Sequence, residues 1–221
     1  MAFFTKEYFK FFSELEKNNN KVWFDANRSR YEEFLKKPFK SFVEHIIAEL
    51  AKDDDTIYRE ASKCIFRINK DIRFSKDKSP YKLNCAAVFG KGGTKDTRPG
   101  YFLHLGHKEI FIGGGMYSPA KEEIEKIRQE IYYNSDTLKA IVSKKDFKQL
   151  YGEIKGEQNK VLPEDYKAFV KEQPYIANKQ FYVVTSFSKE DVLADDFDKK
   201  LLKAFKVMAP LNAFLTQAIS E

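Results

Sequence analysis

The stretch Tyr101-Phe-Leu-His-Leu-Gly-His-Lys-Glu-Ile-Phe-Ile112 decides the fold of this chain. Two runs of aromatic and branched apolar residues, 101–105 and 109–112, flank the three residues Gly106-His107-Lys108. Such runs are typical of strands, and a short turn that contains glycine is typical of a β-hairpin. Because a parallel crossover needs about a dozen residues or more, the two strands are predicted to be antiparallel neighbours.

Further segments on either side of this hairpin carry strand and helix patterns. The predicted strands are 62–68, 84–89, 101–105, 109–113 and 181–186. The predicted helices are a first one capped by Thr5 and running to about Lys17, one around Tyr31 to Leu35, one from Pro38 to Leu50, and 118–133, 138–150 and 163–171. A C-terminal helix follows the capping box Ser188-Lys-Glu-Asp191, and Pro210 is expected to kink or break it. The predicted fold class is α+β, with a mainly antiparallel sheet flanked by N-terminal and C-terminal helices.

The composition is that of a globular chain. Its 221 residues are 43% hydrophobic and 33% charged, which predicts one α+β domain over 1–221, with a helical N-terminal subdomain over 1–55 as the alternative. No signal peptide and no apolar run of about 20 residues is present, so a cytoplasmic location and no membrane partner are expected. Cys64 and Cys85 lie in apolar runs and are predicted to be reduced, buried and unbridged.

A second stretch concentrates positive charge: Arg67-Ile-Asn-Lys-Asp-Ile-Arg-Phe-Ser-Lys-Asp-Lys-Ser-Pro-Tyr-Lys82. Its six basic and two acidic residues leave a net charge of +4, against +6 for the whole chain. Concentrated charge on an ordered loop costs self-repulsion, which favours a role in meeting an anion. The large residues of the stretch are expected to pack in a core; they are Ile68, Ile72, Phe74 and Tyr81.

This stretch supplies the candidate ligand-binding residues, which are Arg67, Lys70, Asp71, Arg73, Lys78, Tyr81 and Lys82. On an extended segment, Arg67, Asn69, Asp71 and Arg73 share one face, which would align two guanidinium groups around a carboxylate. Guanidinium groups suit phosphate or carboxylate oxygens. The structural alternative is an internal ion-pair network, in which Asp71 and Asp77 order the loop.

Other candidate sites are weaker. Gly113-Gly-Gly115 runs into a helix that begins near Ser118, where backbone groups attract anions, but glycine at a close backbone approach is the favoured interpretation. Trp23 is a candidate stacking surface, although a core position is favoured. The histidines form no metal-binding spacing, and no cofactor motif, nucleophile or catalytic set is recognised.

Three motifs stand in order along the chain: Asn18-Asn-Asn-Lys-Val-Trp-Phe-Asp-Ala-Asn27, Arg67 to Lys82, and Gly113-Gly-Gly-Met-Tyr-Ser-Pro119. With them the chain resembles a family of bacterial and fungal conserved hypothetical proteins that is catalogued as a domain of unknown function. The resemblance covers nearly the whole chain and implies a single α+β domain but no activity. Lys70 departs from the pattern, where arginine is expected; lysine keeps the charge but cannot make the bidentate contact of a guanidinium.

Three interpretations of function stay open. The favoured one is a cytoplasmic protein that binds a phosphorylated or otherwise anionic ligand, including nucleic acid, through residues 67–82. The second is an enzyme that acts on an anionic substrate with Asp71 or Asp77 as acid–base group. The third is a structural or interaction protein in which the basic loop is an internal brace.

Overall fold

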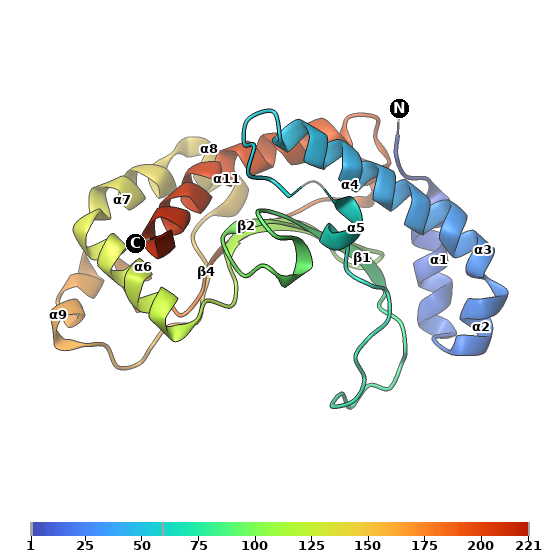
Figure 1. Ribbon diagram of the computed structural model, residues 1–221, viewed down its shortest axis with the longest axis horizontal. Coiled ribbons are helices and arrows are strands. Elements are labelled where there is room, and N and C mark those ends of the chain that lie inside the picture. Colours follow the sequence, from blue (N-terminus) through green and yellow to red (C-terminus); the bar gives the residue numbers. More distant parts are fainter. Residues whose placement is uncertain (1, 59, 221) are drawn as a thin grey trace. The chain divides into compact units, whose positions relative to one another are not determined.

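The computed structural model describes residues 2–58 and 60–220 and confirms the α+β class (Figure 1). Helices at both ends of the chain accompany one four-stranded antiparallel sheet, in which the strands follow the order β1-β2-β3-β4. The strands are β1 (Asn84–Phe89), β2 (Gly100–Gly106), β3 (Ile110–Met116) and β4 (Phe181–Ser186). β2 and β3 are hydrogen-bonded neighbours, and the Gly106 N–H donates to the Glu109 carbonyl across the turn at 2.9 Å. The predicted hairpin is therefore confirmed.

The N-terminal helices form because their apolar residues recur at helical spacing. They are α1 (Lys6–Lys17), α2 (Lys21–Ala26), α3 (Arg28–Tyr31), a π-helical turn (Glu32–Lys36) and α4 (Lys37–Leu50). Thr5 occupies the position before α1, but its side chain accepts no capping hydrogen bond, whereas Asn20 caps α2 by accepting from the Trp23 N–H at 3.0 Å. The buried Tyr8 hydroxyl donates to the Leu105 carbonyl at 3.0 Å, which joins α1 to β2.

The strand predicted over 62–68 is wrong. The segment begins with the short helix α5 (Ala61–Cys64), and only Ile65 then forms an isolated antiparallel bridge, with Ala87. Ala61 and Cys64 are three residues apart and both buried, and α5 packs against α4 and β1. Burial of one helical face therefore outweighs the strand preference of the sequence.

The remaining α-helices follow the hairpin of β2 and β3, whereas the first of the three 3₁₀ turns precedes it. They are α6 (Lys121–Tyr133), α7 (Ser135–Ser143), α8 (Lys145–Tyr151), α9 (Glu164–Lys167), α10 (Lys189–Leu193) and α11 (Phe197–Ser220), with single 3₁₀ turns at Gly93–Lys95, Phe169–Lys171 and Pro174–Ala177. The capping box is confirmed: the Asp191 N–H donates to Ser188 Oγ at 3.0 Å, and the Ser188 N–H to Asp191 Oδ2 at 3.1 Å.

Pro210 does not break the C-terminal helix, because α11 continues through it. Proline inside a helix costs about 3 kcal/mol, since a hydrogen bond is lost and the ring crowds the preceding turn. Buried side chains on both sides of Pro210 offset that cost; they are Phe205, Met208, Leu211 and Leu215.

The chain divides into two compact units. The first comprises Met1–Lys95, Phe102–Ile112 and Ser186–Leu202, and the second comprises Asp96–Tyr101, Gly113–Thr185 and Lys203–Glu221. The core of the first unit is rich in rings: Phe42 stacks on Phe197 with centroids 5.3 Å apart. In the core of the second unit, the Tyr151 hydroxyl donates to the Ala204 carbonyl at 2.7 Å.

Candidate functional site: a basic hairpin arm

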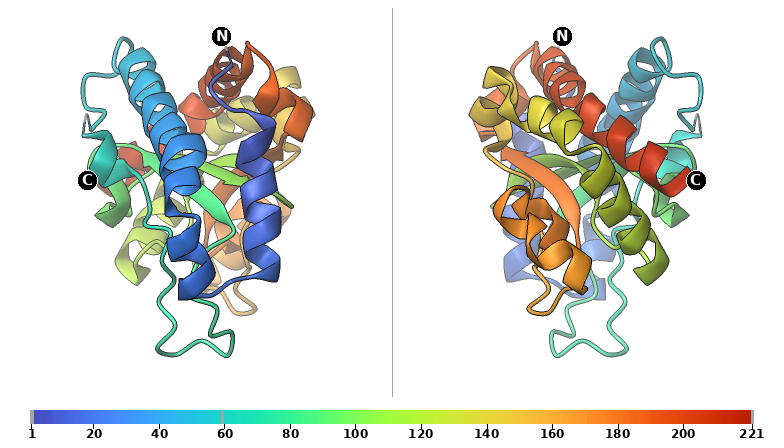
Figure 2. Two further views of the ribbon diagram at one scale, coloured as in Figure 1. Left: turned by 90° about the vertical axis from the view of Figure 1, so that its right-hand side faces the viewer. Right: turned by 90° about the vertical axis from the view of Figure 1, so that its left-hand side faces the viewer.

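Residues 66–82 form a two-stranded loop that leaves the outer edge of β1, which we call the arm (Figure 2). Its two sides are paired by backbone hydrogen bonds. The Lys82 N–H donates to the Ile68 carbonyl and the Lys70 N–H to the Pro80 carbonyl, both at 2.8 Å. The arm is therefore an ordered extension of the sheet edge rather than an irregular basic loop.

The root of the arm is fixed to the N-terminal helices. Tyr81 is buried, and the side-chain amide of Asn19 pairs with its backbone: Nδ2 donates to the Tyr81 carbonyl at 2.9 Å, and Oδ1 accepts from the Tyr81 N–H at 3.1 Å. Of the predicted site residues, Tyr81 is thus an anchor whose ring faces the core.

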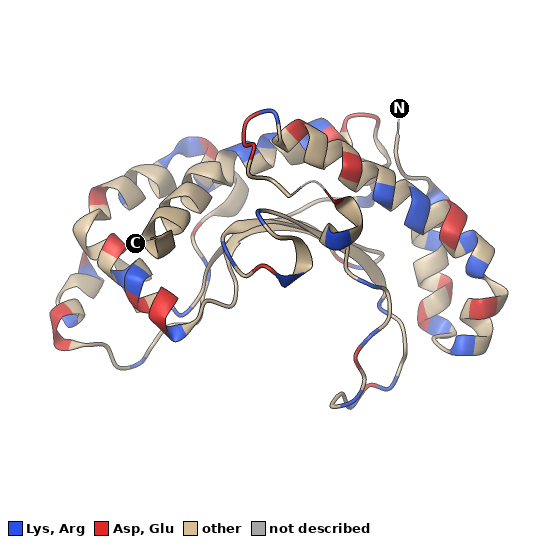
Figure 3. Cartoon of the chain, in the orientation of Figure 1, with Lys and Arg blue, Asp and Glu red and all other residues tan. Residues whose placement is uncertain are grey.

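The tip of the arm is held together by its own ion pairs, with basic and acidic residues interspersed (Figure 3). Arg73 donates to both carboxylate oxygens of Asp71, from Nε at 2.9 Å and from Nη2 at 2.6 Å. Lys70 donates to Asp77 at 2.7 Å and to Ser79 Oγ at 2.6 Å. The hydrogen bonds from Arg73 lower the pKa of Asp71, and those from Lys70 and then Ser79 lower the pKa of Asp77. These four charged groups already neutralise one another.

Exposure alternates along the first side of the arm, as the period-two pattern predicts. Arg67, Asn69, Asp71 and Arg73 are exposed, whereas the residues between them are half-buried. The expectation that Phe74 packs in a core is wrong, because its side chain is 95% exposed. Phe74 lies at the tip, where its contact is the Arg73 guanidinium, 5.9 Å from the ring centre.

The two basic residues at the root differ from those at the tip. Lys82 is half-buried, and its ammonium lies 5.4 Å from the centre of the Phe66 ring. Burial, and next the positive charge of Arg67, lower the pKa of Lys82. Within residues 2–58 and 60–220, neither Arg67 nor Lys82 forms an ion pair with a carboxylate. The positive charge of Arg67 acts on Asp71 as well, whose pKa it helps to lower, so of these two cations Lys82 is the one without a carboxylate nearby in the described residues.

The remaining arm candidate, Lys78, is exposed. Its ammonium donates to the Ile72 carbonyl at 3.0 Å, which closes the turn at the tip. It has one such hydrogen bond and no carboxylate partner among the described residues, so its charge is also available to solvent.

The glycines of β3 are at sites of close backbone approach. A Cβ added to Gly113 would lie 2.7 Å from the Val183 carbonyl oxygen, and Gly115 has a φ of +102°, which L side chains rarely adopt. This supports the structural interpretation of the glycine stretch. Trp23 is half-buried, with its ring 5.4 Å from Phe11, so it is neither a full core residue nor a free stacking surface.

Cys64 and Cys85 are buried and free, as predicted. Desolvation raises the pKa of both thiols, that of Cys85 to about 12. Among the described residues, no group of histidine, cysteine and carboxylate side chains has the arrangement of a metal site. No described helix is long and apolar enough to span a membrane.

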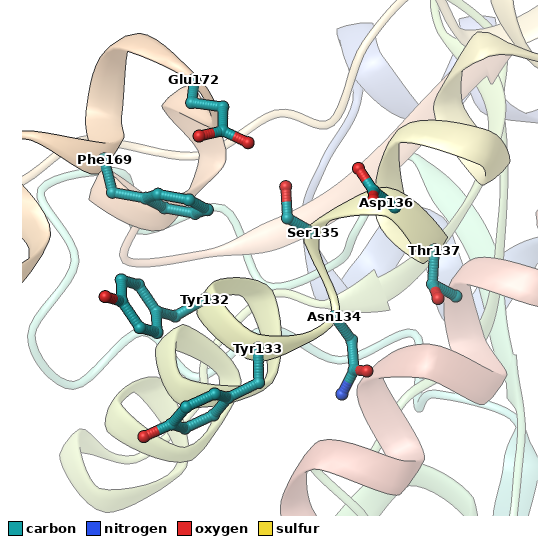
Figure 4. A pocket seen from close by; sticks show the side chains of 8 residues that line it. All are labelled: Tyr132, Tyr133, Asn134, Ser135, Asp136, Thr137, Phe169 and Glu172. Atoms are coloured by element: carbon teal, nitrogen blue, oxygen red, sulfur yellow. The ribbon is translucent and has the colours of Figure 1, made fainter.

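One pocket in the second unit escaped the sequence analysis (Figure 4). It has a volume of about 400 Å³, and its lining residues are Tyr132, Tyr133, Asn134, Ser135, Asp136, Thr137, Phe169 and Glu172. The buried Ser135 hydroxyl has no hydrogen-bond partner in the described part of the chain, while Lys139 donates to Glu172 at 2.8 Å. The Tyr132-Tyr133 doublet hints at it in the sequence, and both carboxylates that line it, Asp136 and Glu172, pair with Lys139.

Comparisons with known proteins complete the description of the site. A search among curated proteins finds no match to this chain. The model of a family described as conserved hypothetical protein (DUF2461) matches residues 7–214, a range that includes the whole arm and the sheet. The chain therefore belongs to the DUF2461 family of conserved hypothetical proteins.

Proposed function

We propose that the protein binds an anionic, phosphate-bearing ligand at the root of the arm, with Arg67 and Lys82 as the principal contacts. The observation that carries this proposal is that neither Arg67 nor Lys82 forms an ion pair with a carboxylate among the described residues, although both belong to the paired root of the arm. Burial of the Lys82 ammonium beside a guanidinium disfavours its charged form, because both desolvation and repulsion act on it. A bound phosphate group would relieve both effects, and a guanidinium offers it two parallel hydrogen bonds.

The tip of the arm plays a different part in this proposal. Lys70 and Arg73 are engaged by Asp77 and Asp71, so they shape the arm rather than supply free charge. The brace interpretation therefore fits the tip, and the binding interpretation fits the root. Lys78 adds a further positive charge near the tip, where it would attract a long anion more than a small one.

The enzyme alternative has less support. A general acid must be protonated near neutral pH, and an effective general base has a pKa close to the working pH. The pKa values of Asp71 and Asp77 are both lowered by hydrogen bonds from cations, so both carboxylates are ionised and weakly basic at neutral pH. We place the protein in the cytoplasm as part of the same proposal, since the two free thiols suit a reducing compartment.

The test is a thermal unfolding series at low salt with inorganic phosphate, pyrophosphate or a short oligonucleotide. A ligand that binds the folded state raises the melting temperature, and added salt weakens the effect by screening. Arg67→Ala and Lys82→Gln should abolish the rise. The matched controls Arg28→Ala and Lys40→Ala, whose side chains pair with Asp25 and Glu44, should retain it. If none of these anions stabilises the parent protein at low salt, the proposal is wrong.

A further inference from the structure

Four rings form a continuous strip on one face of the sheet, from the inner strands β2 and β3 to the arm beside β1. They come from the first residue of the arm and from β2 and β3, all within the first unit; they are Phe66, Phe102, His104 and Phe111. Ring centroids are 6.1 Å apart for Phe66 and Phe102 and 5.9 Å apart for Phe102 and Phe111. His104 stacks on Phe111 at 4.5 Å with the planes inclined by 12°. We call these four residues the ring strip.

The ring strip lies on the face opposite to the core of the first unit. Alternate residues of a strand point to opposite faces, and Leu103, Leu105 and Ile112 are fully buried. The ring-strip residues between them are half-buried. Helix α4 packs against β1 from the core side (Figure 1). The ring strip therefore keeps part of its aromatic surface accessible, although such rings bury much area when a partner covers them.

Positive charge borders the ring strip at the arm. The Lys82 ammonium lies against the Phe66 ring, whereas Arg67, the next residue in the chain, is exposed on the opposite face of the arm. Planar rings beside cations are the combination that receives an unpaired nucleotide chain, because bases stack on the rings while phosphates meet the cations. In a duplex the faces of the bases are already stacked on one another, and an apolar protein partner would gain nothing from the Lys82 ammonium beside the rings.

We infer that the ring strip is a stacking surface for single-stranded nucleic acid, whose phosphates meet Lys82 beside Phe66 and then Arg67 where the strand passes the root of the arm. This inference rests on the proposed function, since the same two cations bind the anion, and it names the class of ligand. His104 takes part as a neutral ring near pH 7, because burial lowers its pKa. A strand that crosses the ring strip toward β1 reaches the root of the arm without leaving the first unit.

The experiment compares oligomers that differ only in their bases. Fluorescein-labelled oligothymidylate and oligouridylate of about 12 nucleotides are titrated against an abasic oligomer of equal length and charge, with anisotropy as the readout. At least one base-bearing oligomer is expected to bind about tenfold or more tightly than the abasic one, since stacking on aromatic side chains contributes to each base. Equal affinity of all three would overturn the stacking inference and leave the proposed anion site standing. No binding of any of them would overturn both.

Variants separate the rings from the charges. Phe102→Leu and Phe111→Leu keep the apolar volume and remove the ring, and each is expected to weaken the base-bearing oligomers about fivefold or more while the abasic affinity is unchanged. Phe111→Tyr should restore binding because it keeps a ring. Lys82→Gln should weaken all three oligomers alike. Tyr133→Ala, which removes an exposed ring in the second unit, is the matched control and should change nothing. Ring-strip variants that fold like the parent, as judged by melting temperature, and bind like the parent would refute the inference.

Discussion

Tyr81 stacks on Phe24 with ring centroids 4.0 Å apart and the planes inclined by only 17°. This contact joins the returning side of the arm to α2, and Tyr81 is 6% exposed. The root of the arm is thus part of the hydrophobic core, whereas its tip is held by exposed ion pairs. The two ends should respond differently to substitution, because apolar burial stabilises more than surface ion pairs do.

Tyr81→Ala is expected to lower the free energy of unfolding by about 3 kcal/mol, since a large buried ring is removed and a cavity remains. Urea denaturation measures the loss. Tyr133→Ala is the control: that ring is 78% exposed, and its removal should leave the unfolding midpoint nearly unchanged. Equal effects of the two substitutions would show that Tyr81 does not anchor the arm.

Asp71→Asn is expected to leave the melting temperature unchanged. Both side chains of the ion pair between Asp71 and Arg73 are exposed, so water replaces the lost hydrogen bonds at little cost in free energy. Differential scanning calorimetry of the parent and the variant provides the comparison. A clear drop in melting temperature would mean that the tip braces the fold, which is the structural interpretation of the whole stretch.

The affinity for an anion should fall as the pH rises. The fall should begin at a lower pH than the one at which an ordinary lysine loses its proton. The ligand favours the protonated Lys82, and burial together with Arg67 lowers the pKa of that ammonium, so neutralisation comes early. The dissociation constant of pyrophosphate, measured between neutral and alkaline pH, tests this. Lys82→Arg keeps its charge throughout and should remove the fall in affinity. An unchanged pH profile in that variant would exclude Lys82 as the titrating group.

Both thiols should react slowly with a thiol reagent in the native protein and rapidly after denaturation. The reactive species is the thiolate, and desolvation raises the pKa of Cys64 and Cys85. Single Cys→Ser variants would resolve the reaction of each thiol. Rapid labelling of the native protein would place at least one thiol at the surface.

Gly115→Ala is expected to destabilise the protein by more than about 2 kcal/mol. Gly115 has a φ of +102°, which strains an L residue, and the Cβ of an alanine there would overlap the Phe181 carbonyl oxygen. Gly152→Ala is a matched control, because Gly152 has a φ of +72° but no atom within 4 Å of the added Cβ. Only the conformational cost remains there, on the order of 1 kcal/mol. Equal losses in chemical denaturation would mean that close packing at Gly115 contributes nothing.

Several features of the fold could be predicted from sequence because they depend on neighbouring residues. The hairpin of β2 and β3 follows from two strand-like runs and a short turn, and α1 follows from apolar residues at helical spacing. The alternating exposure of Arg67, Asn69, Asp71 and Arg73 follows from the two-residue period of extended chain.

Other features were decided by packing between distant residues. The segment 61–64 became helical because Ala61 and Cys64 are buried against α4 and β1, and α11 passes through Pro210 because buried side chains hold it on both sides. Phe74 resembles Phe66 in the sequence, yet one lies at the tip of the arm and the other joins the ring strip.

The sequence by itself determined the α+β class, the hairpin and the concentration of charge in residues 67–82. Only the tertiary structure decided which of those charges are neutralised and which rings share a face. The physical reason is range: helical and strand periodicity act over a few neighbouring residues, whereas burial, ion pairing and ring contacts join residues far apart in the chain. Lys70 and Arg73 form ion pairs with carboxylates within the arm, while Lys82 lies against Phe66 without one among the described residues.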